Sequence, residues 1–182
     1  RDDVVVISNH INAGGGDGAE VIYALRNNDK LAKSVLESIG KEGQNMRKYY
    51  QRRYPTDPSK DYYFIHRETC KTEPILVEYG FLDSPNDDVN QLKNNVLDYA
   101  EAVVRAVAEY AKQLATQHNV PMIATGHLFM TGGLTNEGDG VRDLYVGTLG
   151  QLKTDLFSPD FNYVALGHIH QHQRVGGLNH IR

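Results

Sequence analysis

The chain has 182 residues, of which 40% are hydrophobic and 23% charged, and this balance excludes an intrinsically disordered protein. A net charge of −4 gives no general surface for polyanions, although it leaves room for a local basic patch at Arg47, Lys48, Arg52 and Arg53. The single cysteine, Cys70, excludes an internal disulfide and a thiolate metal cluster. Any metal must therefore be held by histidine and carboxylate side chains.

The first residues predict an α/β arrangement. Residues 4–7 are β-branched and, with Ser8, predict a buried parallel strand that ends at Asn9 and His10, before a glycine-rich turn. The loops that follow strand ends in open α/β sheets line ligand-binding crevices. His10 is therefore a candidate metal ligand, with a hydrogen-bonded core histidine as the alternative. Residues 19–25 predict a second strand, and residues 29–43 predict a helix that ends at Gly43.

A second candidate side chain lies further along the chain. Residues 47–60 predict a basic, tyrosine-rich loop, and residues 61–66 and 74–81 predict two more strands. Glu78 lies in the last of these strands, between apolar neighbours. Because an unpaired buried carboxylate is costly, Glu78 is either a paired structural charge or a catalytic group. Both alternatives stay open on the residues alone.

Residues 86–119 predict one long amphipathic helix. Asp87 and Asp88 suit its first turn, where carboxylates oppose the positive end of the helix dipole, and Pro121 follows its end. A coiled coil is the alternative, but alanine dominates the apolar face, which favours packing against a sheet. The apolar residues recur every three or four positions, which is the helical period; they are Val89, Leu92, Val96, Ala100, Val103, Val107, Tyr110 and Leu114.

Five collinear segments of the first 110 residues together resemble the zinc-dependent N-acetylmuramoyl-L-alanine amidases, which cut peptidoglycan. The segments are SNHINAGGGDGAEVIY, GQNMRKYYQRR, DYYFIHR, ILVEYGFLDS and the YAEAVVRAV stretch. The resemblance implies that His10 is the family's last zinc ligand and that Glu78 is its catalytic glutamate. Glu20 is close enough in the motif to orient a ligand, with an exposed strand carboxylate as the alternative. The family's other zinc ligands precede His10, where this chain has nine residues.

The last third of the chain contains a second group of histidines. A predicted strand at residues 122–125 runs into Gly126 and His127, and another at residues 163–166 runs into Gly167 and the His168-Ile169-His170 segment. Residues two apart in an extended segment point to the same side, so His168 and His170 can face one metal cluster. Surface histidines on a loop are the alternative.

The segment from about residue 112 to residue 182 resembles the SbcD nuclease subunit, a bacterial calcineurin-like metallophosphoesterase. The resemblance implies two manganese ions, a DNA substrate and an SbcC-like ATPase partner, with His127, His168 and His170 as metal ligands. The family's opening DxH, GD and GNHD motifs are absent from this chain. Two-metal phosphodiester hydrolysis needs the carboxylates of those motifs, because hard cations prefer oxygen ligands.

The sequence thus predicts an α/β fold, with a mostly parallel sheet flanked by helices and a long helix that joins two partial α/β blocks. The expected domains are residues 1–111, similar to an amidase, and residues 112–182, similar to SbcD, in a chain that reads as a chimera or a set of truncated pieces. One further arrangement would build a single zinc site from His10 and His127 across both blocks, with Glu137 or Asp143 as the carboxylate ligand.

Three functions are consistent with this interpretation: a zinc-dependent peptidoglycan amidase, a manganese-dependent DNA exonuclease subunit, and an inactive scaffold with residual metal binding. The first indicates a secreted or cell-wall protein, and the second a cytoplasmic one. No apolar run approaches the roughly 18 residues of a membrane span.

Overall fold

The computed structural model describes residues 4–126, 154, 157, 159–167 and 172–182. The chain divides into two compact units, Arg1–Tyr110 and Ala111–Arg182. Within the described residues, every helix is too short or too polar to cross a membrane.

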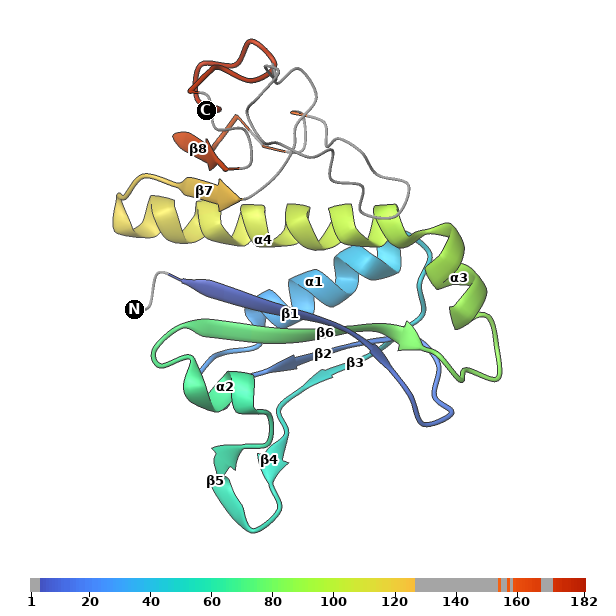
Figure 1. Ribbon diagram of the computed structural model, residues 1–182. Coiled ribbons are helices and arrows are strands. Elements are labelled where there is room, and N and C mark those ends of the chain that lie inside the picture. The colour runs from blue at the N-terminus through green and yellow to red at the C-terminus, as the bar shows by residue number, and fades with distance from the viewer. Residues whose placement is uncertain (1–3, 127–153, 155–156, 158, 168–171) are drawn as a thin grey trace, which may run out of the picture. The chain divides into compact units, whose positions relative to one another are not determined.

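A four-stranded mixed sheet forms the centre of the first unit (Figure 1). Its strands lie in the order β1-β6-β2-β3, and their bounds are β1 (Val5–Asn12), β6 (Glu73–Phe81), β2 (Ala19–Tyr23) and β3 (Met46–Tyr50). The β1–β6 and β2–β3 pairs are parallel, whereas β2 and β6 are antiparallel. The predicted α/β class, with a mostly parallel sheet flanked by helices, is confirmed.

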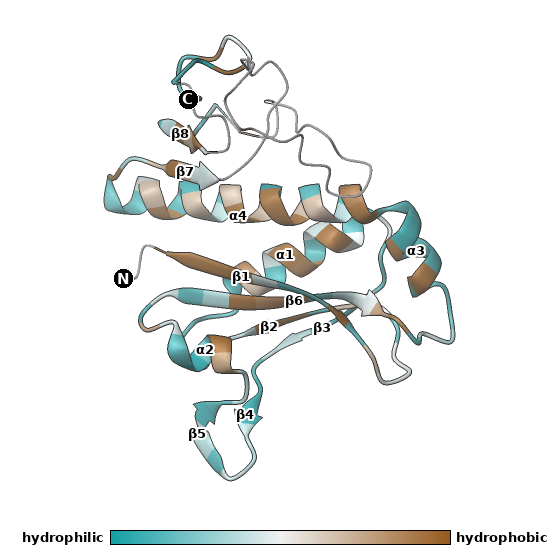
Figure 2. Cartoon of the chain, in the orientation of Figure 1, coloured by the Kyte–Doolittle hydropathy of each residue, from teal (hydrophilic) through white to brown (hydrophobic). Residues whose placement is uncertain are grey.

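One face of this sheet carries the hydrophobic core. Helix α1 (Lys30–Lys41) follows Asp29 and ends before Gly43, whose φ of 96° is the left-handed conformation that glycine adopts at helix ends. Figure 2 shows apolar residues concentrated along β1, β2 and β6 and on α1. The core joins the sheet to α1 and to the next long helix, and its largest buried members include Val21, Leu31, Val35, Ile39, Ile75, Val77 and Tyr99.

The prediction of one helix over residues 86–119 is wrong, because the structure divides it into α3 (Asp88–Asn94) and α4 (Val96–His118). The interruption falls at Asn95, whose side-chain amide donates to the Tyr99 hydroxyl at 3.3 Å. Asparagine favours helix ends, since its side chain competes for the hydrogen bonds that would continue the helix. The boundary between the two compact units, Tyr110 to Ala111, falls within α4.

The buried face of α4 also differs from the prediction. The periodicity places Val96 and Ala100 on the buried face, yet both are exposed. The break at Asn95 changes the phase of the helix, so that the buried residues are Tyr99, Ala102, Val103 and Ala106. The two alanines let the helix approach the core closely.

The predicted loop at residues 47–60 and the predicted strand at residues 61–66 are both wrong. The first region contains most of β3 and the hairpin of β4 (Arg53–Tyr54) and β5 (Asp57–Asp61), and the second leads into helix α2 (Phe64–Glu68). The hairpin projects away from the sheet (Figure 1). Cation–aromatic contacts lie just outside its two strands, where the Arg52 guanidinium is 3.9 Å from the centre of the Tyr62 ring. Contacts between the two sides of the hairpin thus outweigh the turn-forming composition.

Helix α2 carries a fully buried histidine, His66. Neither of its ring nitrogens has a hydrogen-bond partner among the described residues, and Nδ1 lies 3.8 Å from Asp61 Oδ1. Burial lowers the pKa of His66, the Asp61 charge opposes this shift, and the Arg26 charge adds to it. The folded protein therefore favours neutral His66.

This burial predicts a pH dependence of stability. The pKa of His66 in the folded protein lies below the ordinary histidine value of about 6.5. The stability that neutral His66 contributes is therefore fully present above that pH, and it is lost as the pH falls through the folded pKa. We expect the free energy of unfolding to fall less between about pH 7 and pH 5 in His66→Leu than in wild type, as measured by urea unfolding. The exposed His118→Leu should keep the wild-type slope, and equal slopes for His66→Leu and wild type would contradict the prediction.

In the second unit, β7 (Ile123–Gly126) and β8 (Tyr163–Leu166) pair in parallel, which confirms the two strands predicted there. A small core lies beside them and contains Val164, Val175 and Ile181.

Candidate active site

Three of the predicted site residues lie in one row across the sheet of the first unit. His10 on β1 pairs in register with Glu78 on β6, and Glu78 pairs with Glu20 on β2. Paired residues of neighbouring strands project to the same face of a sheet. The alternating residues Val21 and Val77 face the core, so the row occupies the opposite face.

His10 lies inside β1, which corrects the prediction that the strand ends there. It is exposed, and its Nε2 is hydrogen bonded to the Ser8 hydroxyl at 2.7 Å. Ser8 shares the face of His10, because the two residues are two positions apart on one strand. In the tautomer whose Nε2 donates to Ser8, Nδ1 keeps a lone pair that can bind a metal ion.

Glu78 is buried, with 9% of its surface exposed, and its Oε2 has no hydrogen-bond partner among the described residues. Burial raises the pKa of Glu78, while the neighbouring His10 lowers it and the Glu20 charge raises it. A carboxylate in this environment binds a proton more tightly than an ordinary glutamate. It is thus suited to accept a proton and pass it on.

Glu20 is buried rather than exposed, so the alternative of an exposed strand carboxylate is wrong. Its Oε1 lies 3.0 Å from Arg47 Nε, and its Oε2 accepts a hydrogen bond from the Tyr50 hydroxyl at 3.2 Å. Burial and then the Glu20 charge raise the pKa of Tyr50, which keeps this hydroxyl protonated as the donor. The carboxylate of Glu20 is therefore held by groups from β3.

The glycine-rich turn after β1 is held in place by two aspartates. The Asp83 carboxylate accepts a hydrogen bond from the Gly14 N–H at 2.9 Å. Asp88 is fully buried, and its carboxylate accepts from the N–H groups of Gly18 at 2.9 Å and Phe81 at 2.7 Å. The sequence pattern predicts Asp88 only as a charge at a helix start, because its role at the turn depends on a contact between residues about 70 positions apart.

One group of three potential metal ligands exists within the described residues, and sequence reasoning did not identify it. It consists of Asp17, Asp87 and Asp88. Its members are all carboxylates, which suit a hard cation better than zinc. Both oxygens of Asp88 already accept backbone hydrogen bonds, which indicates a structural role.

A zinc site would need more ligands than the described residues place around His10. Catalytic zinc takes three protein ligands and a water molecule. His10 offers one imidazole, and within the described part of the chain it belongs to no group of three potential ligands. These residues therefore fit a part of a zinc site and do not complete one.

The family model described as N-acetylmuramoyl-L-alanine amidase matches residues 1–109, which include this whole row of side chains. The chain belongs to that family. Members of the N-acetylmuramoyl-L-alanine amidase family are typically metal-dependent.

Two solved structures from Clostridium difficile are similar to this member of the amidase family. The match with Cwp6 has a TM-score of 0.52 at 23% identity and covers 58% of this chain and 17% of the Cwp6 chain. This similarity supports the α/β fold. An N-acetylmuramoyl-L-alanine amidase from strain 630 has a TM-score of 0.47 at 26% identity and covers 58% of this chain and 56% of its own.

Curated relatives of this amidase-family chain are SbcD proteins of the SbcCD nuclease. The match with the Escherichia coli K12 protein is 34% identical over an alignment of 115 residues and covers 59% of this chain and 28% of that protein. The Rhodobacter capsulatus protein is 36% identical over 78 residues, which are 43% of this chain and 17% of that protein. The chain thus spans less than a third of the length of these relatives.

The predicted nuclease ligands His127, His168 and His170 lie outside the described residues. The residues just before them are described. Strand pairing places Gly126 opposite Leu166, and the Gly167 N–H donates to the Gly126 carbonyl at 2.7 Å. The ends of β7 and β8 therefore meet at one edge of their small sheet.

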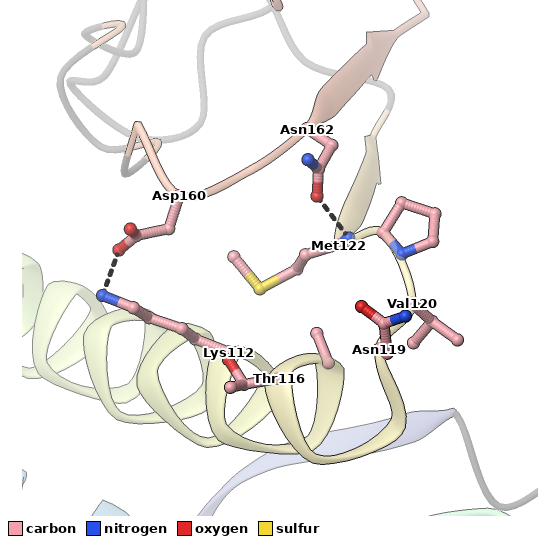
Figure 3. Close-up of a pocket in the computed structure, with 9 residues that line it drawn as sticks. Lys112, Thr116, Asn119, Val120, Met122, Asp160 and Asn162 are labelled. Atoms are coloured by element: carbon pink, nitrogen blue, oxygen red, sulfur yellow. Dashed lines mark hydrogen bonds and ion pairs between the residues drawn. The ribbon is translucent and has the colours of Figure 1, made fainter.

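A pocket of about 530 Å³ in the second unit lies beside the C-terminal end of α4 (Figure 3). Lys112 and Asp160 pair within it at 2.9 Å, and Asn162 accepts a hydrogen bond from the Met122 N–H. Its charged side chains pair with each other, and the described residues that line it include no predicted site residue.

Proposed function

We propose that the protein hydrolyses the amide bond between the lactyl group of muramic acid and L-alanine in peptidoglycan. One observation carries the proposal beyond family membership. The buried Glu78 carboxylate has an Oε2 with no hydrogen-bond partner among the described residues, and it lies in register with His10. A buried oxygen without a partner is costly for a purely structural glutamate. A proton acceptor, in contrast, requires an oxygen that is free to take the proton.

In this proposal, Glu78 takes the proton from the attacking water and delivers it to the leaving nitrogen of L-alanine. Its raised pKa favours the protonated state that the second transfer requires. His10 contributes one metal ligand, and Ser8 fixes the orientation of its ring. Zinc, when bound, would polarise the amide carbonyl and lower the pKa of water toward 7.

Metal analysis tests the role of His10. If His10 is a zinc ligand, the wild-type chain should retain more zinc after dialysis against a zinc-containing buffer than His10→Ala does, because the substitution removes a ligand from a site that the described residues already leave incomplete. Atomic absorption measures the zinc content. His118→Ala, an exposed histidine at the end of α4, should keep the wild-type content. Equal zinc in wild type and His10→Ala would exclude His10 as a ligand.

A manganese-dependent DNA exonuclease subunit is the second candidate. The observation that favours it is the parallel pairing of β7 and β8, which brings Gly126 and Gly167 together at the positions that precede His127 and His168. Such a subunit would act on DNA with an SbcC-like ATPase partner. Manganese-dependent DNA cleavage that is lost in His168→Ala would support this candidate. Bound zinc and amide hydrolysis, with no cleavage of DNA, would favour the amidase.

A further inference from the structure

The pairing of β2 with β3 contains an irregularity beside the candidate active site. Ala19 pairs with Met46, but Glu20 pairs with Lys48, so that Arg47 is an extra residue on β3. Such a bulge changes the direction of side chains, and bulges are frequent next to active sites. As a consequence, Arg47 and Lys48, which are consecutive, both reach Glu20. Their nitrogens lie 3.0 and 3.6 Å from Glu20 Oε1.

Two cations therefore surround one carboxylate. Arg47 is fixed in place: its guanidinium lies 5.0 Å from the centre of the Phe81 ring, and a Cβ at Gly16 would overlap it. Lys48 is less engaged, since 3.6 Å exceeds a hydrogen-bond distance and its ammonium makes no hydrogen bond within the described part of the chain. Its ammonium lies 4.2 Å from the Tyr50 ring, and its side chain is 49% exposed.

Lys48 also continues the row of candidate active-site residues. Glu78 pairs with Glu20, and Glu20 pairs with Lys48, so Lys48 lies two strands from Glu78 on the same face. Neighbouring strands are about 4.8 Å apart, which separates the two backbones by about 10 Å. An extended peptide covers about 3.3 to 3.6 Å per residue. A peptide that crosses the strands from Glu78 would thus bring its first three residues within reach of the Lys48 ammonium.

We propose that Lys48, supported by Arg47 and Tyr50, forms a subsite that binds a carboxylate on the peptide part of the substrate. The ligand class is an acidic peptide attached to an amino sugar. This subsite rests on the proposed amidase function, because it takes Glu78 as the position of the reacting amide. The alternative is that both cations only neutralise the buried Glu20.

Binding of two ligands that differ in charge alone tests the subsite. The ligands are muramoyl-L-alanyl-D-glutamate with both carboxylates free and the diamide of the same compound, and their affinities are measured by titration calorimetry with the full chain. We expect wild type to bind the dicarboxylate about tenfold more tightly, because a charge-assisted hydrogen bond is worth on the order of 1.5 kcal/mol or more. Lys48→Gln should reduce this preference to less than twofold, and Lys48→Arg should keep most of it.

Lys33→Gln is the matched control, since Lys33 is an exposed lysine on α1 with 54% of its side chain accessible. It should leave the preference unchanged. Equal affinity of wild type for both ligands, or a preference that Lys48→Gln retains, would overturn the subsite and leave the neutralising role. Turnover is scored separately: if wild type binds the dicarboxylate selectively but cleaves neither ligand, the subsite stands and the hydrolytic function fails.

Discussion

Replacing Glu78 with glutamine is expected to slow hydrolysis of a muramoyl-L-alanine peptide by about a hundredfold to ten-thousandfold, the usual contribution of a general acid–base group. Glutamine has nearly the shape of glutamate but cannot carry the proton. Glu78 Oε2 makes no hydrogen bond among the described residues. Replacing this oxygen therefore removes no hydrogen bond that stabilises the fold there. The rate of release of the free peptide measures the effect.

Glu73→Gln provides the matched control for this experiment. Glu73 is also a buried carboxylate on β6, at the first residue of the strand, where it accepts a hydrogen bond from the Tyr110 hydroxyl at 2.8 Å. The same chemical change at Glu73 should leave the rate within a few fold of wild type. A similar loss in both variants would mean that β6 tolerates no amide, and a full rate in Glu78→Gln would remove Glu78 from the mechanism.

Asp88→Ala is expected to destabilise the protein by about 2 to 6 kcal/mol. The Asp88 carboxylate accepts hydrogen bonds from the buried N–H groups of Gly18 and Phe81, and each buried donor left without a partner costs about 1 to 3 kcal/mol. This is a large part of the roughly 5 to 15 kcal/mol that stabilises a typical domain. Urea unfolding followed by circular dichroism measures the change.

The neighbouring Asp87 is the control for Asp88. Asp87 is exposed, and its carboxylate accepts a hydrogen bond from the Gln91 side chain at 3.1 Å. Asp87→Ala should cost about 1 kcal/mol or less, as expected for an exposed side chain near a helix start. If Asp88→Ala unfolds at the same urea concentration as Asp87→Ala, the two backbone hydrogen bonds contribute little to the fold.

The sequence singled out His10 and Glu78 as candidate site residues, but it did not show that they lie in register on neighbouring strands. Their residue types and their strands could be inferred from β-branched runs and from motif resemblance. Their in-register pairing depends on the order β1-β6-β2-β3, which brings together strands that are about 70 positions apart. Register is set by which faces are buried across strands, and periodicity within one strand does not contain that information.

The irregular positions could not be predicted for a related reason. The bulge at Arg47 and the break at Asn95 each shift the phase of the residues after them, so that Lys48 joins the row of Glu20 and Val96 turns away from the core. The bulge depends on the pairing of β3 with β2, and the break depends on a single asparagine that the apolar periodicity does not take into account. Proline and tyrosine between residues 47 and 60 indicated a loop, whereas the structure has a hairpin there, with the Tyr54 ring packed against Arg67 and the Tyr62 ring against Arg52.

The most direct test of the amidase account is the position of oxygen incorporation when wild type acts on a muramoyl-L-alanine peptide in water enriched in heavy oxygen. Attack at the lactyl carbonyl places the label in the carboxyl group of the muramic acid product, and mass spectrometry should find it there beside a peptide with a free L-alanine amino group. An intact substrate, or label in a fragment of the peptide, would contradict the account.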